Sequence, residues 1–200
     1  HGLLRRQRQM CIRDRVCEGQ QADMDFASKN GITENEYFEM IKNKTAVLIG
    51  CSFMFGGIVA EANDFNTNLL YEIGLNLGIA FQLEDDLLDC FGDQEKFGKK
   101  IGGDITEKKK TLLYLFTNSN LEPKKKLEFE NIFNSNEIAE SEKINSIKLF
   151  YETSGALKYV KNKVKVYFDK ADQLINKLEL DNDTKRKLNQ FSKTLLNREI

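Results

Sequence analysis

The sequence predicts an all-α fold, a bundle of five or more long helices, and three observations support this prediction. Lys, Glu, Leu, Ile and Asn dominate the composition, whereas proline occurs once, at Pro123, and tryptophan is absent. Apolar residues recur at helical spacing along the chain, and there is almost no strand signal. The length of 200 residues suits one domain, or a large part of one, with a substantial core.

In the first half of the chain, one helix is expected to end near Ser28. Thr33 and Glu36 have the spacing of a capping box. A long helix is therefore expected to begin at Glu34 and to run to about Asn63.

The chain after residue 63 is expected to be helical as well. A helix from Thr67 to about Phe91 is predicted with Asn66 as its cap. Residues 92–103 are expected to form a glycine-punctuated loop, and residues 105–118 another helix. The remaining chain has the pattern of four amphipathic helices, with breaks expected near residues 134–137, 153–155 and 181–182.

The first fifteen residues differ in composition from the rest of the chain. They contain five of the seven arginines and no lysine. They also lack the continuous apolar stretch and the small-residue cleavage site of a signal peptide. We therefore interpret residues 1–15 as a non-native leader and residues 16–200 as the domain; a native basic arm is the alternative.

Charge and cysteine content exclude several classes of function. The chain has 30 basic and 31 acidic side chains, so nothing indicates a nucleic-acid partner. The four cysteines show no C-x-x-C spacing, and one histidine cannot supply a zinc site. Free thiols without a secretory leader fit the cytoplasm. No apolar run reaches the 18 residues that a transmembrane segment needs.

Acidic and basic residues are grouped by sign in the segment 81–111. Asp85, Asp86 and Asp89 lie in an otherwise apolar run, and a group of lysines follows them. On a helix Asp85 and Asp89 share one face, so their repulsion calls for a compensating cation. Mg²⁺ prefers oxygen ligands, often takes one or two carboxylates and completes its shell with water and phosphate. The segment therefore predicts a site for magnesium and a phosphate-bearing polyanion.

The alternative is an acidic helix end followed by a solvated loop. Four apolar residues are interleaved with the acids and weigh against it, because they indicate that one side of this helix is buried. These residues are Phe81, Leu83, Leu87 and Leu88. The acids are then expected to line an interior cleft or its rim.

Three segments together resemble the trans-isoprenyl diphosphate synthases, the polyprenyl synthetase family. "FQLEDDLLDCFGDQEKFGKKIGGDITEKKKT", residues 81–111, resembles the second aspartate-rich motif of that family. "EGQQAD", residues 18–23, is similar to its G-Q-x-x-D segment, and "YFEMIKNKTAVLI", residues 37–49, to the helix that carries its Lys-Thr pair. The resemblance implies an isoprenoid synthase-type helical bundle of which residues 16–200 are the C-terminal portion.

The resemblance also implies a metal site. Asp85 would ligate Mg²⁺ directly, and Asp86 and Asp89 would ligate it or act through bound water. Two or three Mg²⁺ ions would bind together with the substrate diphosphate. Gln20 and Asp23 would support this site from a neighbouring helix.

Further residues would contact the substrates, by the same resemblance. Lys44 and Lys99 would bind the diphosphate of the allylic substrate, and Lys109 would add positive charge at the closing loop. Thr45 and Gln82 would lie near the reacting carbons, with their oxygens facing a developing allylic cation.

The implied activity is that of a trans-prenyltransferase of the polyprenyl, geranylgeranyl or farnesyl diphosphate synthase type. Such an enzyme condenses dimethylallyl, geranyl or farnesyl diphosphate with isopentenyl diphosphate in isoprenoid biosynthesis. Members of the family are commonly homodimers. The family's first aspartate-rich motif is absent from this sequence. We therefore expect a chain truncated at its N-terminus and inactive in condensation by itself.

Other functions remain open at this point. A related terpene cyclase uses the same fold and metals, but it usually carries a different second metal motif. A non-catalytic helical subunit of a heteromeric synthase would have an eroded metal motif, whereas all three aspartates are present here. A helical interaction domain with merely solvated acids would not bind diphosphate in a Mg²⁺-dependent manner.

Overall fold

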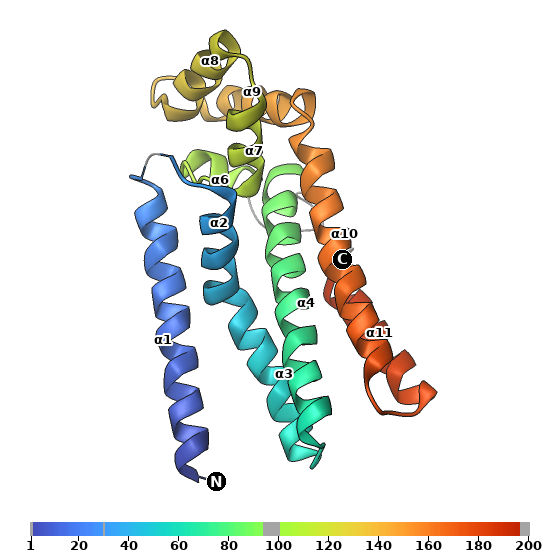
Figure 1. The fold of residues 1–200 in the computed structure, drawn as a ribbon. Coiled ribbons are helices and arrows are strands. Elements are labelled where there is room, and N and C mark those ends of the chain that lie inside the picture. Colours follow the sequence, from blue (N-terminus) through green and yellow to red (C-terminus); the bar gives the residue numbers. More distant parts are fainter. Residues whose placement is uncertain (1, 30, 94–100, 197–200) are drawn as a thin grey trace. The chain divides into compact units, whose positions relative to one another are not determined.

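The computed structural model describes residues 2–29, 31–93 and 101–196, and Figure 1 shows that the described chain is helical. Side chains are described from residue 12 to residue 195 within these ranges. The described residues contain no strand, so the prediction of an all-α fold is confirmed.

The helices α1, α2, α3 and α4 span Gly2–Phe26, Glu34–Ile41, Val47–Val59 and Asp64–Phe91. The helices α6 to α11 span Gly103–Thr106, Leu112–Asn120, Pro123–Asn134, Glu140–Thr153, Ala156–Lys177 and Asn182–Leu196. The assignment of residues 1–15 to a leader stays a prediction.

The capping box at the start of α2 is confirmed. The Thr33 N–H donates to Glu36 Oε2 at 2.8 Å, and the Glu36 N–H donates to Thr33 Oγ1 at 3.2 Å. The Lys29 ammonium also donates to Glu36 Oε1 at 2.5 Å. These reciprocal bonds satisfy N–H groups that a helix start leaves without partners, which fixes the first turn of α2.

The ionised form of Glu36 should stabilise the fold over a defined pH range. The hydrogen bond from Lys29, followed by those from Thr33, lowers the pKa of Glu36 from 4.5 to about 2. A carboxyl whose pKa is lower in the folded state stabilises the fold above its unfolded pKa and loses this contribution as the pH falls. Glu36→Gln should therefore be less stable than the unsubstituted chain at pH 7. The difference should shrink between pH 4.5 and about 2.

Urea denaturation at a series of pH values checks this expectation. Glu128→Gln, at an exposed position of α8, serves as the control and should follow the unsubstituted chain at every pH. A stability difference for Glu36→Gln that is independent of pH would contradict it.

The long helix expected from residue 34 to about residue 63 contains a π-helical segment. This segment, η1, spans Lys42–Ala46 and separates α2 from α3. The flanking residues Ile41 and Val47 keep right-handed helical dihedral angles, so the chain continues in one direction. Short π-helical segments inside α-helices occur frequently at functional sites. Here the segment carries Lys44 and Thr45, two of the predicted site residues.

The predicted cap of the next helix is wrong. The helix α4 begins at Asp64, and Asn63 is its cap, since Asn63 Oδ1 accepts the Asn66 N–H at 2.8 Å. The Asn66 side chain is instead used in a tertiary contact, where its Oδ1 accepts the Glu179 N–H at 2.9 Å. Two asparagines three residues apart both look like caps, and only the fold distinguishes them.

The expected helix over residues 105–118 is also wrong, because it is divided into α6 and α7. Lys108 between them has a φ of 57°, a left-handed conformation that ends α6. Its ammonium donates to the Asn134 carbonyl and to Asn136 Oδ1, both at 2.7 Å. By contrast, the four helices predicted for the remaining chain are confirmed as α8, α9, α10 and α11, with the expected breaks.

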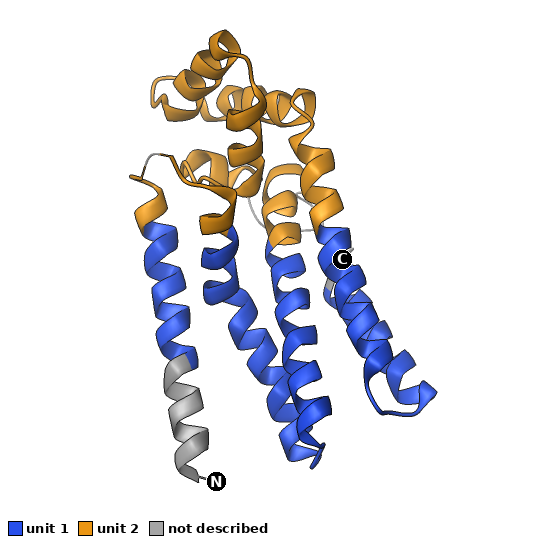
Figure 2. Ribbon diagram, viewed as in Figure 1, with its two compact units in different colours: residues 1–24, 38–82, 164–198 blue, residues 25–37, 83–163, 199–200 orange. Residues whose placement is uncertain are grey.

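The chain divides into two compact units, which Figure 2 shows in different colours. Unit 1 comprises residues 1–24, 38–82 and 164–198, and unit 2 comprises residues 25–37, 83–163 and 199–200. The core of unit 1 joins α4 to the end of α10 and contains Ile73, Leu77, Ala171, Ile175 and Leu178. The core of unit 2 includes an aromatic cluster of Tyr114, Phe129, Phe133, Phe150 and Tyr151.

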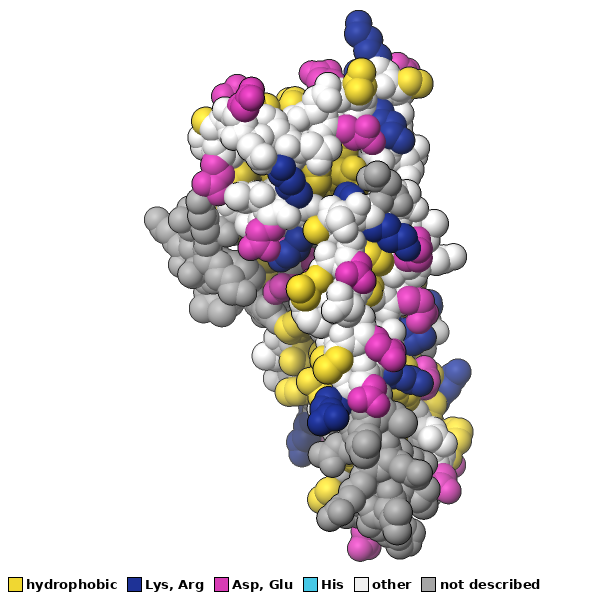
Figure 3. Space-filling model, turned by 90° about the vertical axis from the view of Figure 1, so that its left-hand side faces the viewer, with side chains coloured by type: hydrophobic (Ala, Val, Ile, Leu, Met, Phe, Trp, Pro, Cys, Tyr) yellow, Lys and Arg dark blue, Asp and Glu magenta, His cyan; other side chains and the backbone are white. Residues whose placement is uncertain are grey.

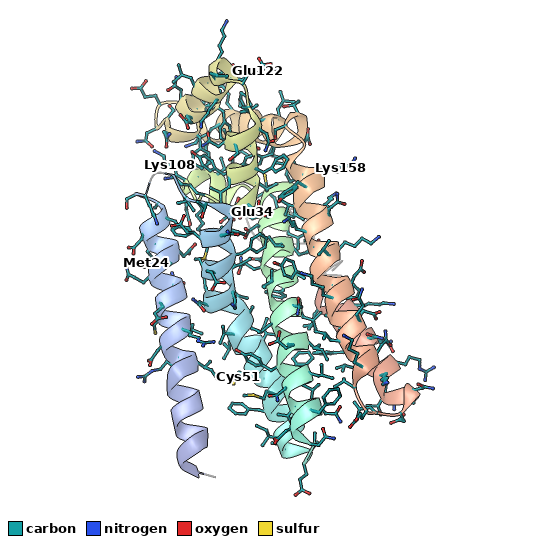
Figure 4. All side chains as sticks on the ribbon, in the orientation of Figure 1. Met24, Glu34, Cys51, Lys108, Glu122 and Lys158 are labelled. Carbon is teal, nitrogen blue, oxygen red and sulfur yellow. The ribbon has the colours of Figure 1, made fainter. Side chains whose placement is uncertain are left out.

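Within unit 2, the start of α2 is tied to α10. Glu34, which Figure 4 labels, accepts hydrogen bonds from the Tyr159 hydroxyl at 2.8 Å and from Lys163 Nζ at 2.9 Å. Together with the capping box, these contacts fix both the start and the direction of α2.

The described surface carries both signs of charge. On the face drawn in Figure 3, acidic and basic side chains are interspersed. This distribution agrees with the formal net charge of −1. In the part of the chain that the structure describes, no helix has the length and apolar character to cross a membrane.

Candidate functional site

The three predicted metal ligands lie near the end of α4, in unit 2. Asp86 is 7% exposed, and Asp85 and Asp89 are half-buried. Leu83 and Leu87 of the same helix are buried, as their interleaved pattern indicated. At least one of the three carboxylates therefore lies in the interior of unit 2 and is not on a solvated helix end.

The buried carboxylate of Asp86 has a partner from α2. The Tyr37 hydroxyl donates to Asp86 Oδ2 at 2.5 Å, and the Tyr37 side chain is 1% exposed. The sequence placed Tyr37 in the segment that resembles the Lys-Thr helix but assigned it no role. A contact between residues 49 positions apart leaves no local signal in the sequence.

The carboxylate of Asp89 is held by the chain that follows the loop. Asp89 Oδ2 accepts the Asp104 N–H at 2.9 Å, and the Gly102 N–H donates to the Asp89 carbonyl at 2.6 Å. A Cβ on Gly103 would lie 3.0 Å from Asp89 Oδ1, tighter than most such contacts. A glycine at this position therefore allows the backbone to approach the acid closely.

Asp89 lies in surroundings that disfavour its negative charge. Burial raises the pKa of Asp89 above its ordinary value. The hydrogen bond from Asp104 opposes this change, whereas the negative charges of Asp104 and Asp85 reinforce it. A bound cation would relieve both the burial penalty and the repulsion.

Lys109 forms ion pairs in this structure. Its ammonium lies 2.8 Å from Asp104 Oδ1 and 3.0 Å from Glu107 Oε2. Burial acts to lower the pKa of Lys109, but the hydrogen bond and charge of Asp104 outweigh it and raise the pKa above its ordinary value. Lys109 is therefore a fixed cation at neutral pH. Asp104 was not predicted as a site residue, although it stands in the G-D-I part of the motif.

The remaining predicted residues that the structure describes lie in unit 1. The Lys44 ammonium contacts Asp23 Oδ2 at 2.7 Å, and Thr45 Oγ1 donates to Gln82 Oε1 at 2.7 Å. The structure thus brings together Thr45 and Gln82, which the resemblance had named as a pair, and also Lys44 and Asp23, which it had named separately. Gln20 is exposed on α1. Lys99 lies outside the described residues.

Close packing of α1 against η1 determines the position of Lys44 and of the adjacent Thr45. A Cβ on Gly19 of α1 would lie 2.2 Å from the Lys44 backbone nitrogen, so only glycine permits this approach. Asp23 lies one turn further along α1, which brings its carboxylate to the Lys44 ammonium. The glycine of the G-Q-x-x-D segment therefore has a steric role next to η1.

The donor set near the end of α4 fits a magnesium ion held jointly with phosphate. Among the described residues, no three His, Cys, Asp or Glu side chains converge as a preformed ligand cluster. Mg²⁺ does not require such a cluster, because one or two carboxylates, water and substrate phosphates commonly complete its octahedral shell. Asp85, Asp86 and Asp89 supply only oxygen donors, and two of these carboxylates are already oriented by hydrogen bonds.

Comparisons with known proteins identify the family of the chain. The model of the polyprenyl synthetase family matches residues 7–150. The geranylgeranyl diphosphate synthase of Saccharolobus solfataricus is 37% identical over 172 residues, which cover 86% of this chain and 51% of that protein. The chain thus spans about half the length of this relative.

Solved structures give the same assignment. A crystal structure of a geranylgeranyl pyrophosphate synthase is 39% identical, with a TM-score of 0.90 over 97% of this chain and 60% of that one. The polyprenyl synthase of Caulobacter crescentus CB15, complexed with calcium and isoprenyl diphosphate, is 28% identical. Its TM-score is 0.87 over 97% of this chain and 58% of that one. The described chain has the all-α isoprenoid synthase fold, and it belongs to the polyprenyl synthetase family.

Proposed function

We propose that this chain acts in a Mg²⁺-dependent trans-prenyltransferase that condenses an allylic diphosphate with isopentenyl diphosphate in isoprenoid biosynthesis. The observation that carries the proposal is the carboxylate arrangement of α4, in which Asp86 is buried against Tyr37 and Asp89 accepts the Asp104 N–H. The relatives named as geranylgeranyl diphosphate synthases support the class of reaction. A cytoplasmic homodimer is part of the same proposal.

The carboxylates and lysines have complementary roles in this reaction. Diphosphate leaves the allylic carbon as a highly charged anion, so groups that stabilise this charge as it develops lower the barrier. Bound Mg²⁺ would supply most of that positive charge. Asp85, Asp86 and Asp89 would hold the metal, and Lys44 and Lys109 would contact phosphate oxygens that the metal leaves uncovered.

The two lysines are positioned before any substrate arrives. Asp23 holds Lys44 and Asp104 holds Lys109, both at hydrogen-bonding distance. Preorganised charges need little rearrangement during the reaction, which is the main source of electrostatic catalysis. Lys99, the third lysine of the proposal, has the same expected role at the phosphate.

Thr45 and Gln82 are proposed to face the allylic cation. Their mutual hydrogen bond fixes the hydroxyl hydrogen of Thr45 on Gln82 Oε1. The Thr45 oxygen therefore keeps its lone pairs for an electron-poor carbon. An apolar surrounding is needed as well, because water would capture such a cation.

Binding of inorganic diphosphate tests the proposal directly. Isothermal titration calorimetry should show that the unsubstituted chain binds diphosphate in the presence of Mg²⁺ and much more weakly without it. Asp85→Ala should lower the Mg²⁺-dependent affinity by more than about tenfold, because it removes a metal ligand. Asp169→Ala, at an exposed position of α10, is the matched control and should bind normally. Equal affinities with and without Mg²⁺ would refute the proposal.

A further inference from the structure

We infer that Tyr37 is a positioning residue for the metal site, which acts by orienting the Asp86 carboxylate. This inference rests on the proposed function, because it assigns Asp86 to a metal. Its observation is the hydrogen bond from the Tyr37 hydroxyl to Asp86 Oδ2 at 2.5 Å between two buried side chains of unit 2.

The buried position of Asp86 makes this bond important. A carboxylate that loses contact with water must gain hydrogen bonds or a cation to remain ionised. Hydrogen bonds from a hydroxyl to an ionised carboxylate are charge-assisted and are among the stronger hydrogen bonds in proteins. The Tyr37 hydroxyl therefore fixes the direction of the Asp86 carboxylate through Oδ2. Hydrogen bonds that a neighbouring side chain donates to a metal ligand orient this ligand and raise metal affinity.

Tyr37 is itself held rigidly. Its N–H donates to the Thr33 carbonyl at 3.1 Å in the first turn of α2, which the capping box closes. Glu34 in the same turn accepts hydrogen bonds from Tyr159 and Lys163 of α10. The phenol ring leaves only two side-chain torsions to fix, so burial on a capped helix determines where its hydroxyl lies.

A purely structural role is the competing explanation, and it predicts different measurements. If Tyr37 only stabilises the core, Tyr37→Phe lowers the unfolding temperature without changing the affinity of the folded chain for metal. If Tyr37 orients Asp86, the folded variant binds metal less tightly. In that case Tyr37→Phe lowers the metal affinity of a chain that contains Asp86 and has no effect on the metal affinity of a chain that lacks it.

The test uses the full 200-residue chain and Mn²⁺ as the metal probe, with inorganic diphosphate present. Electron paramagnetic resonance at low temperature measures free Mn²⁺. Circular dichroism at that temperature measures the fraction of the chain that is folded. Tyr37→Phe should bind Mn²⁺ about 10–100-fold more weakly than the unsubstituted chain. Tyr114→Phe removes the hydroxyl of another buried tyrosine of unit 2 and is the matched control, so its affinity should be unchanged.

A double-mutant cycle provides the second measurement. Asp86→Ala should weaken Mn²⁺ binding, and adding Tyr37→Phe to it should cause no further loss, because both substitutions remove the same oriented ligand. Unchanged affinity for Tyr37→Phe, or additive losses in the cycle, would overturn the inference while leaving the proposed function intact. Absence of any binding by the unsubstituted chain would instead refute the proposed function, and the inference with it.

Discussion

Truncation of Phe129 to alanine is expected to lower the free energy of unfolding by about 3–5 kcal/mol. Phe129 is fully buried in unit 2, at the centre of the aromatic cluster. Its ring centroid lies 5.3 Å from that of Tyr114, 5.4 Å from Phe150, 5.9 Å from Phe133 and 6.1 Å from Tyr151. The substitution removes these ring contacts and leaves a cavity that four large rings cannot readily fill. Urea denaturation followed by circular dichroism measures the loss.

Leu127→Ala is the matched control on the same helix. Leu127 is 61% exposed, so its truncation should change the free energy of unfolding by no more than about 0.5 kcal/mol. Comparable losses for the two variants would show that the aromatic cluster does not carry the stability of unit 2.

Local sequence patterns were sufficient to predict most of the helices. The capping box of Thr33 and Glu36 uses contacts three residues apart, so the sequence alone specifies it. The last four helices follow from amphipathic spacing and from breaks with small polar residues. The wrong cap at Asn66 has a different cause, since its side chain bonds to Glu179, 113 residues away.

The candidate site could be predicted only in part from the sequence, because some of its residues form a local motif and others depend on contacts between distant residues. Asp85, Asp86 and Asp89 form a compact motif, and the apolar residues between them indicated the burial of Asp86 and the half-buried positions of the other two. Tyr37 and Asp104 were missed, because their roles depend on contacts made by the fold. Tyr37 acts across 49 residues of chain, and Asp104 acts on Asp89 through a backbone N–H, which every residue except proline possesses.

The other large effect is expected from Gly78→Val, which should lower the free energy of unfolding by about 3 kcal/mol. Gly78 lies on α4 where this helix meets η1 within unit 1. A Cβ at this position would lie 2.5 Å from the Cα and 2.8 Å from the Cβ of Ala46. The nearest atom belongs to the backbone, so the two helical segments must separate before a side chain fits. Urea denaturation of the variant measures the cost.

Two further variants identify the cause of the stability loss expected for Gly78→Val. Gly56→Val places the same side chain on α3 where no atom lies within 4 Å of the new Cβ, so its stability should change by about 0.5 kcal/mol or less. Ala46→Gly added to Gly78→Val should not restore stability, because the Cα of residue 46 remains in place. Recovery in this double variant would show that side-chain crowding alone causes the loss.

The same close contact also fixes part of the proposed catalytic arrangement. Gln82 lies one turn beyond Gly78 on α4, and Thr45 directly precedes Ala46 in η1. Separation of α4 from η1 should therefore lengthen the 2.7 Å hydrogen bond between Thr45 and Gln82. In the folded fraction of Gly78→Val, hydrogen exchange of the η1 amides should be faster than in the unsubstituted chain. Unchanged exchange in η1 would mean that α4 accommodates the valine without moving the Lys-Thr segment.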